Sequence, residues 1–260
     1  MVRTVHSLFD LAGRVALITG GSRGLGLQIA EALGEAGARL LLVARKAPEL
    51  TAAAAHLAGL NIQVRTLATD LRKEGAVGDI IASLQSQEQR LDILVNNAGA
   101  TWGAAAENYP IEAWHKVMQL NVTAPFELTQ AMATNFFIPQ GGGAVINVAS
   151  IEGLQAHAPE LVGTVAYNTS KGALINMTRA MAAEWGPKHI RVNALAPGFF
   201  PTRMTAITLD ANGERLRAAT PLGRLGGEED LKGAAVLLAS DAGAHITGQI
   251  LIVDGGATII

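Results

Sequence analysis

The chain has 260 residues, of which 49% are hydrophobic and 16% charged, with a formal net charge of −2 and no cysteine. This composition is that of an ordinary globular protein, and it argues against nucleic-acid or anionic-membrane partners and excludes disulfides, thiolate catalysis and cysteine metal sites. The first residues lack the apolar core of a signal peptide, and no apolar run approaches the roughly 18 residues of a membrane span, so we expect a soluble, cytoplasmic protein.

Short apolar segments alternate with amphipathic ones along the whole chain. Strands are predicted at residues 14–19, 39–44, 62–67, 91–95, 144–149, 191–196 and 249–253. Helical patterns lie between them, such as residues 25–34, where Leu25, Ile29, Ala32 and Leu33 repeat at helical spacing. Strands that are apolar throughout suit a parallel sheet covered on both faces. We therefore predict a single α/β domain, residues 1–260, of the Rossmann-type, doubly wound class with a seven-stranded parallel sheet flanked by helices on both faces.

A glycine-rich loop follows the first predicted strand, in Thr19-Gly20-Gly21-Ser22-Arg23-Gly24-Leu25-Gly26. Glycines let the backbone approach a pyrophosphate, and the following helix N-terminus supplies unpaired N–H groups. The general fingerprint G-x-G-x-x-G/A does not fit, but the variant T-G-x-x-x-G-x-G does. A plain strand-to-helix turn is the alternative to nucleotide binding by Gly20, Ser22, Arg23, Gly24, Leu25 and Gly26.

Tyr167 and Lys171 stand four residues apart, a spacing that places both side chains on one helix face. A nearby ammonium favours the phenolate and lowers the pKa of a phenol from about 10 toward the working range. The chain has only two tyrosines, Tyr109 and Tyr167. The spacing thus predicts an acid–base pair, although alone it also describes an exposed surface pair.

Further motifs follow later strands: Asn96-Asn97-Ala98-Gly99, Asn121, Ser150 and Pro197-Gly198-Phe199-Phe200-Pro201-Thr202. With these, the chain resembles a classical short-chain dehydrogenase/reductase over nearly its whole length. The resemblance implies hydride transfer between a nicotinamide cofactor and a secondary alcohol or ketone.

Catalytic roles follow from the same resemblance. It implies that Tyr167 is the acid or base, that Lys171 lowers its pKa and binds the nicotinamide ribose, and that Ser150 donates to the substrate oxygen. Asn121 would hold a water that links Lys171 to solvent. Taken alone, Ser150 is a strand-end turn serine and Asn121 a helix-kink or capping amide.

Cofactor contacts are also implied by the resemblance. Asp70 and Leu71 would meet the adenine; Asn97, Ala98 and Gly99 would pass under the adenosine ribose; and Pro197, Gly198, Phe200 and Thr202 would flank the nicotinamide amide and the phosphates. An alternative for Asp70 is the N-cap of a helix through residues 73–83. For Asn97 the alternative is a loop-stabilising amide.

The second predicted strand ends in Val43-Ala44-Arg45-Lys46, without the carboxylate that binds the ribose 2′-hydroxyl in NAD enzymes. Arg45 can bind a 2′-phosphate bidentately, and Arg23 supplies a second cation. NADP(H) is therefore the expected cofactor, with NAD(H) and merely solvated arginines as the alternative.

Two segments are expected to cover the substrate, residues 151–166 and residues 199–219, the second as a lid that excludes water. Sixteen residues separate Ser150 from Tyr167, a few more than is common in the family resembled, and the extra length falls around residues 155–163. An inert surface bulge is the alternative, and His157 within it is interpreted as solvated. Trp102, Phe199, Phe200 and Met204 suggest an apolar or mixed pocket, or plain core. The histidines show no ligand spacing, so no metal is expected.

Three functional hypotheses follow. The leading one is an NADP(H)-dependent oxidoreductase for a small secondary alcohol or ketone. Alternatives within the class are a 3-oxoacyl-carrier-protein reductase and a gluconate-type sugar-acid dehydrogenase. A non-catalytic dinucleotide-binding sensor is a remote alternative, against which the complete set of Asn121, Ser150, Tyr167 and Lys171 argues. A homotetramer is implied by the resemblance and supported by the apolar tail at residues 257–260; no nucleic-acid or membrane partner is expected.

Overall fold

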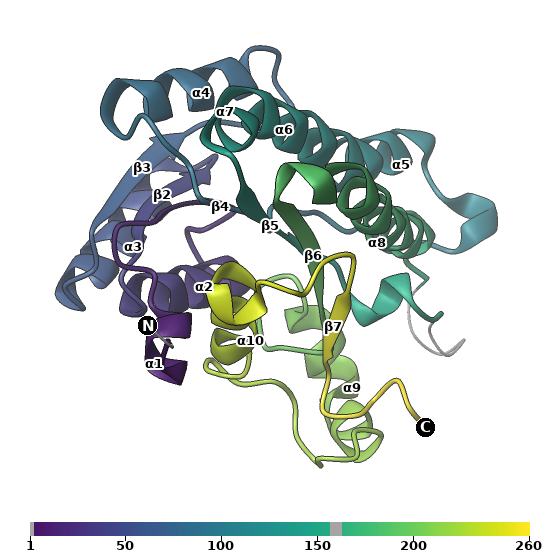
Figure 1. Ribbon diagram of the computed structural model, residues 1–260. Helices are drawn as coiled ribbons and strands as arrows, with labels where there is room; N and C mark the ends of the chain where they lie inside the picture. Colours follow the sequence, from purple (N-terminus) through teal and green to yellow (C-terminus); the bar gives the residue numbers. More distant parts are fainter. Residues whose placement is uncertain (1–2, 157–162) are drawn as a thin grey trace.

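A computed structural model, which describes residues 3–156 and 163–260, contains one parallel sheet of seven strands in the order β3-β2-β1-β4-β5-β6-β7 (Figure 1). The predicted seven-stranded parallel sheet is confirmed, and each predicted strand lies within two residues of an observed one. The strands are β1 (Val15–Thr19), β2 (Arg39–Ala44), β3 (Val64–Ala68), β4 (Ile93–Asn96), β5 (Gly143–Val148), β6 (Ile190–Pro197) and β7 (Ile250–Val253).

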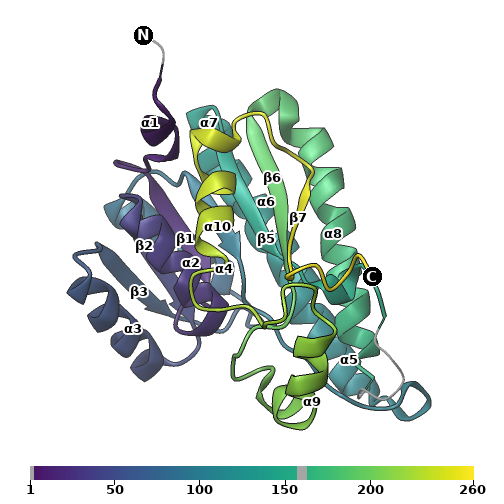
Figure 2. The ribbon, with the colours of Figure 1, turned by 90° about the horizontal axis from the view of Figure 1, so that it is seen from below.

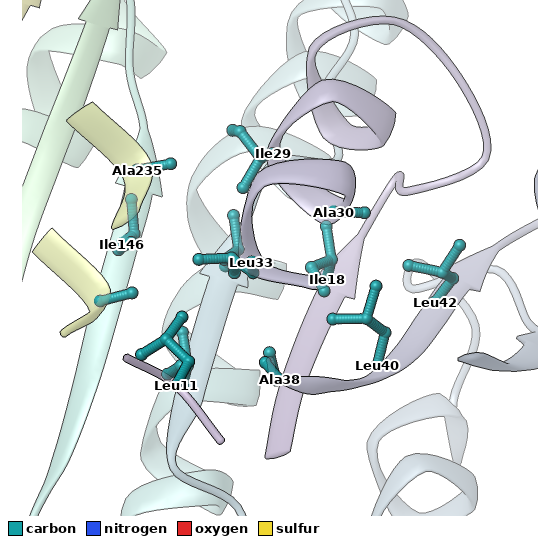
Figure 3. Packing of buried hydrophobic residues seen from close by; sticks show 14 of the residues in the cluster. Leu11, Ile18, Ile29, Ala30, Leu33, Ala38, Leu40, Leu42, Ile146 and Ala235 are labelled. Carbon is teal, nitrogen blue, oxygen red and sulfur yellow. The ribbon is translucent and has the colours of Figure 1, made fainter. Parts of the chain in front are cut away.

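Helices cover both faces of the sheet, as Figures 1 and 2 show. Alternate residues of a strand point to opposite faces, so in β1 Ala16 and Ile18 join one apolar cluster while Val15 and Leu17 join the other. The first cluster, drawn in Figure 3, is closed by α2 (Gly24–Glu35), α3 (Ala47–Gly59) and α10 (Lys232–Ala239). The second is closed by α4 (Ala76–Gln87), α6 (Ala124–Met132) and α8 (Val165–Trp185).

The remaining helical segments are short, except one. They are α1 (Val5–Phe9), α5 (Ile111–Met118), α7 (Ile138–Gln140), four 3₁₀ turns at Ala106–Asn108, Ile151–Gly153, Gly186–Lys188 and Asp241–Gly243, two π-turns at Gln119–Thr123 and Ala133–Phe137, and the longer α9 (Ala206–Ala218). None of the helices in the described part of the chain is both long and apolar enough to cross a membrane.

The strand order reverses between β1 and β4, and ligands of open α/β sheets bind at such a switch point, beyond the carboxyl ends of the strands. Two side chains, those of Asn97 and Thr19, join the loops after β4 and β1 there. Asn97 donates through Nδ2 to the carbonyl oxygens of Thr19 and Gly20 at 3.0 and 3.1 Å. Thr19 Oγ1 accepts from the backbone N–H groups of Asn97 and Ala98 at 3.0 and 3.1 Å. Asn97 therefore stabilises both loops, and its predicted place under the adenosine ribose stays a prediction.

The alternative that Asp70 caps a helix through residues 73–83 is wrong. The helix α4 begins at Ala76, and its N-cap is Gly75 in a left-handed backbone conformation. Asp70 instead accepts from the backbone N–H of Arg72 and from its guanidinium, at 3.1, 3.0 and 2.7 Å. These bonds to Arg72 hold the pKa of the Asp70 carboxyl at about 2, so it is ionised at neutral pH.

Candidate active site and dinucleotide cleft

The glycine loop between β1 and α2 forms a cradle that side chains would fill. Gly20 and Gly24 have φ of +64° and +54°, which favour glycine. A Cβ on Gly20 would lie 3.0 Å from the Ala98 Cα, and one on Gly26 would overlap the Gly20 carbonyl. The N-cap residue of α2, Arg23, makes no side-chain capping bond among the described residues, so the first N–H groups of this helix have no cap there. The cradle therefore fits a pyrophosphate.

A cavity of about 910 Å³ runs from this loop to Ser150 and Tyr167. Among the described residues, its lining includes nearly all of the predicted site: Gly20, Ser22, Arg23, Gly24, Leu25, Arg45, Asp70, Leu71, Asn97, Ala98, Gly99, Ser150, Tyr167, Lys171, Pro197, Gly198, Phe200 and Thr202. Gly26 and Asn121 lie outside the lining; Gly26 instead lets the start of α2 pack closely against Gly20 and the side-chain amide of Asn97.

Ser150, Tyr167 and Lys171 meet at one end of this cavity. Ser150 lies two residues after the end of β5, while Tyr167 and Lys171 lie one turn apart in α8. Lys171 is 4% exposed, its Nζ lies 5.5 Å from the centre of the Tyr167 ring, and it donates to the Val148 carbonyl at 2.6 Å. Ser150 hydrogen-bonds the Tyr167 phenol. The predicted acid–base pair is thus assembled with its serine.

The pKa of Tyr167 lies above its ordinary value, opposite to the direction that the Tyr–Lys spacing predicted. Burial is the largest cause, the negative charge of Glu152 is the second, and the hydrogen bond from Ser150 acts in the other direction. Burial also lowers the pKa of Lys171 from 10.5 to about 8, although Glu152 opposes this. Without a bound cofactor, Tyr167 is therefore a neutral acid at physiological pH.

Asn121 lies in the π-turn Gln119–Thr123, and its side chain is fully buried. Its amide accepts from the Ala100 N–H at 2.8 Å and donates to the Ala100 carbonyl at 2.9 Å and to Ser170 Oγ at 3.0 Å. These bonds join the loop after β4 to α8, a link that no interpretation of the sequence predicted, while the π-turn around Asn121 fits the helix-kink alternative. The predicted water relay stays a prediction. A Cβ on Gly99 would lie 3.4 Å from Asn121 Oδ1 and 3.8 Å from Lys171 Nζ, so this loop passes close to both.

A ladder of buried polar side chains, joined by hydrogen bonds, lies beneath the candidate catalytic residues. No motif in the sequence predicted it. It consists of Asn96, Thr129, Asn147 and Thr178, joined by hydrogen bonds of 2.8, 2.9 and 2.9 Å, and it links β4, β5, α6 and α8. Buried polar groups that satisfy one another fix the relative positions of the elements that carry them. The sequence signal that could have predicted this ladder is an asparagine in each of two otherwise apolar strands.

Two carboxylates in the cavity lining were also missed. Glu152 follows Ser150 by two residues in a 3₁₀ turn, and its Oε2 accepts from Thr164 Oγ1 at 3.1 Å. Glu49, in the first turn of α3, lies among Arg23, Lys46 and Arg203. No sequence motif singles out either residue, because their surroundings are built from distant segments.

The structure describes only part of the two segments that are expected to cover the substrate. Phe199, Phe200 and Met204 line the cavity, and α9 occupies residues 206–218 of the proposed lid. Trp102 is 52% exposed and lies outside the lining. Most of the extra loop length, including His157, lies outside the described residues.

Comparisons with known proteins agree on one group of enzymes. The family model described as enoyl-(acyl carrier protein) reductase matches residues 20–258. The chain is 42% identical to the rhamnolipids biosynthesis 3-oxoacyl-[acyl-carrier-protein] reductase of Pseudomonas aeruginosa, over 97% of this chain and 99% of that protein.

Solved structures extend this similarity to the fold. A short-chain type dehydrogenase/reductase from Mycobacterium marinum superposes with a TM-score of 0.94 at 35% identity, covering 99% of this chain and all of that one. A gluconate 5-dehydrogenase from Burkholderia cenocepacia, solved with NADP and tartrate, gives 0.92 at 34% identity, with 99% and 100% coverage.

Proposed function

The chain belongs to the classical short-chain dehydrogenase/reductase family, and from this premise we propose that it is an NADP(H)-dependent oxidoreductase that interconverts a secondary alcohol and a ketone. The observation that carries the proposal is one cavity that holds the glycine cradle at one end and Ser150, Tyr167 and Lys171 at the other. The bound nicotinamide supplies or accepts the hydride; the protein supplies orientation, protons and electrostatics.

In ketone reduction, Tyr167 donates its phenolic proton to the carbonyl oxygen, and Ser150 donates a hydrogen bond to the same oxygen as negative charge develops. The raised pKa of Tyr167 suits this direction, because the residue starts as the protonated acid. Lys171 adds a positive charge beside the phenol and would donate to the ribose hydroxyls of the cofactor. Asn121 positions the Ala100 loop and α8 through its three hydrogen bonds.

The remaining predicted residues hold the dinucleotide. The cradle from Gly20 to Gly26 binds the pyrophosphate, Asp70 and Leu71 meet the adenine, Asn97, Ala98 and Gly99 pass under its ribose, and Pro197, Gly198, Phe200 and Thr202 flank the nicotinamide end. Apart from Gly21 and Gly26, these residues line one cavity, which supports this assignment.

We propose a neutral substrate group next to the reacting carbon. Glu152 lines the cavity and is close enough to raise the pKa of both Tyr167 and Lys171. A like charge so near would repel an anionic substrate. A small alcohol or ketone, or a neutral acyl thioester as in a 3-oxoacyl-carrier-protein reductase, fits better than a sugar acid whose carboxylate approaches Glu152.

The cofactor preference can be tested without knowing the substrate. Arg23 of the glycine loop and Arg45 after β2 both line the cavity, and they would hold the 2′-phosphate of NADP(H). We expect NADPH to bind at least about tenfold more tightly than NADH, or about 1.4 kcal/mol, in a titration followed by nicotinamide fluorescence. Equal or tighter binding of NADH would contradict the preference for NADP(H). It would also indicate that both arginines are solvated surface residues without a role in cofactor choice.

Replacing Glu152 by glutamine tests the electrostatics of the acid–base pair. The charge of Glu152 raises the pKa of Tyr167, so its removal lowers that pKa. Alcohol oxidation needs the phenolate, which forms above the pKa, so the acid limb of kcat/KM for oxidation should move to lower pH, by on the order of one unit. An unchanged or upward-shifted limb in the Glu152→Gln profile would show that another group controls it.

We also propose that the enzyme is a homotetramer. Exposed apolar side chains on several elements would be covered by association: Ile111, Phe126, Ile252, Ile259 and Ile260. A cytoplasmic location stays a prediction from the sequence.

A further inference from the structure

Three cations from three separate segments converge on one carboxylate oxygen. Glu49 Oε1 lies 3.3 Å from Arg23 of the glycine loop, 3.1 Å from Lys46 after β2, and 3.7 Å from Arg203 in the segment after β6. All four side chains line the cavity. This group, Glu49 with Arg23, Lys46 and Arg203, is called the Glu49 cluster below.

Glu49 is an anion at neutral pH. The hydrogen bond from Lys46 is the largest cause of its lowered pKa, and the charges of Arg23, Lys46 and Arg203 act in the same direction. Its place in the first turn of α3 also suits a negative charge, because the positive end of the helix dipole lies there. The cations are already paired with an anion of the protein itself.

The same three cations could bind a phosphate group. Guanidinium and ammonium groups around one point match the several oxygens of a phosphate. The cluster stands where β2 ends and α3 begins, beside Arg45. This is the place at which the proposed function puts the 2′-phosphate of NADP(H).

We propose that Glu49 is an internal competitor of the cofactor 2′-phosphate and thereby a determinant of cofactor preference. The carboxylate and the phosphate repel each other and claim the same donors, so Glu49 weakens NADP(H) binding and leaves NAD(H) binding almost unaffected. Arg203 belongs to the segment expected to act as a lid, so its transfer from Glu49 to the phosphate ties that segment to the adenosine half of the cofactor. This inference rests on the proposed use of NADP(H).

A structural role for the cluster alone predicts a different outcome. The cation side chains are 48%, 55% and 70% exposed, and ion pairs this exposed contribute little to folding. A Glu49→Gln variant should therefore fold normally, which thermal unfolding can check. If Glu49 only held the cations in place, its removal would let them move and would weaken the binding of NADPH.

The test is a fluorescence titration of wild type and Glu49→Gln with NADPH and with NADH at low ionic strength. We expect the Kd for NADPH to fall by about three- to tenfold and that for NADH by less than about twofold, with the difference shrinking as salt is added. Glu31→Gln is the matched control. It removes the same charge from the same cavity, but Glu31 pairs with His56 and Lys232, so both cofactors should respond alike.

Two outcomes overturn the inference: an NADPH affinity that falls in Glu49→Gln, or an NADPH-to-NADH ratio that changes no more than in Glu31→Gln. The proposed cofactor preference is tested separately, by the wild-type ratio. A wild type that prefers NADH together with a selective gain of NADPH affinity in Glu49→Gln would reject the preference for NADP(H) and retain the role of Glu49.

Discussion

Replacing Tyr167 by phenylalanine should lower turnover by about 10²- to 10⁴-fold, because the variant keeps the half-buried ring and loses the proton that the proposed reaction transfers. Binding of NADPH persists, since the cradle from Gly20 to Gly26 is untouched. The measurement is steady-state ketone reduction beside a fluorescence titration with NADPH. A loss of turnover without a loss of cofactor binding separates chemistry from folding.

The chain offers a matched control in its other tyrosine. Tyr109 donates to the Trp102 carbonyl at 3.1 Å, and its hydroxyl lies outside the Ser150–Tyr167–Lys171 group. Tyr109→Phe should keep activity within a few-fold of wild type. Activity of Tyr167→Phe in that same range would reject Tyr167 as the acid–base residue.

Lys171→Met should lose activity by about the same 10²- to 10⁴-fold and should also bind cofactor less tightly. The change removes a buried positive charge beside the phenol and leaves the Val148 carbonyl without this donor. Some loss of stability is expected as well, so unfolding should be followed in parallel.

The pH dependence of kcat/KM tests the role of the Lys171 ammonium more sharply than the loss of activity does. Burial lowers the pKa of Lys171 to about 8, so the cation is present below that pH and is lost above it. Wild-type kcat/KM should therefore decline above about pH 8 where the ammonium is needed. A guanidinium stays charged, so Lys171→Arg should retain some activity and lack this decline. A decline at the same pH in Lys171→Arg would assign it to another group.

The fold could be predicted from the sequence because its signals are local. Apolar runs of four to six residues predict β1, β2 and β5. In the glycine loop, residues such as Gly20 and Gly24 indicate a backbone with positive φ. The candidate catalytic residues could be proposed from the sequence as well, because each stands near a strand end or on the helix after it, and Ser150, Tyr167 and Lys171 do meet in one cavity.

Charges and their effects on pKa could not be predicted in the same way. The rise in the pKa of Tyr167 depends on how deeply the phenol is buried and on the nearby carboxylate of Glu152. The Glu49 cluster joins residues 23, 46, 49 and 203, which become neighbours only when the sheet is complete. The alternative of a helix cap for Asp70 is wrong because it places the start of α4 too early.

The ladder of Asn96, Thr129, Asn147 and Thr178 has a consequence for enzyme engineering. It holds α8 against β4 and β5 without using any residue of segments 151–166 or 199–219. The candidate catalytic pair on α8 is thus anchored through β5, while segments 151–166 and 199–219 can be lengthened or exchanged with no ladder bond lost. Directed evolution toward a new substrate would best randomise those two segments and leave the four ladder residues unchanged.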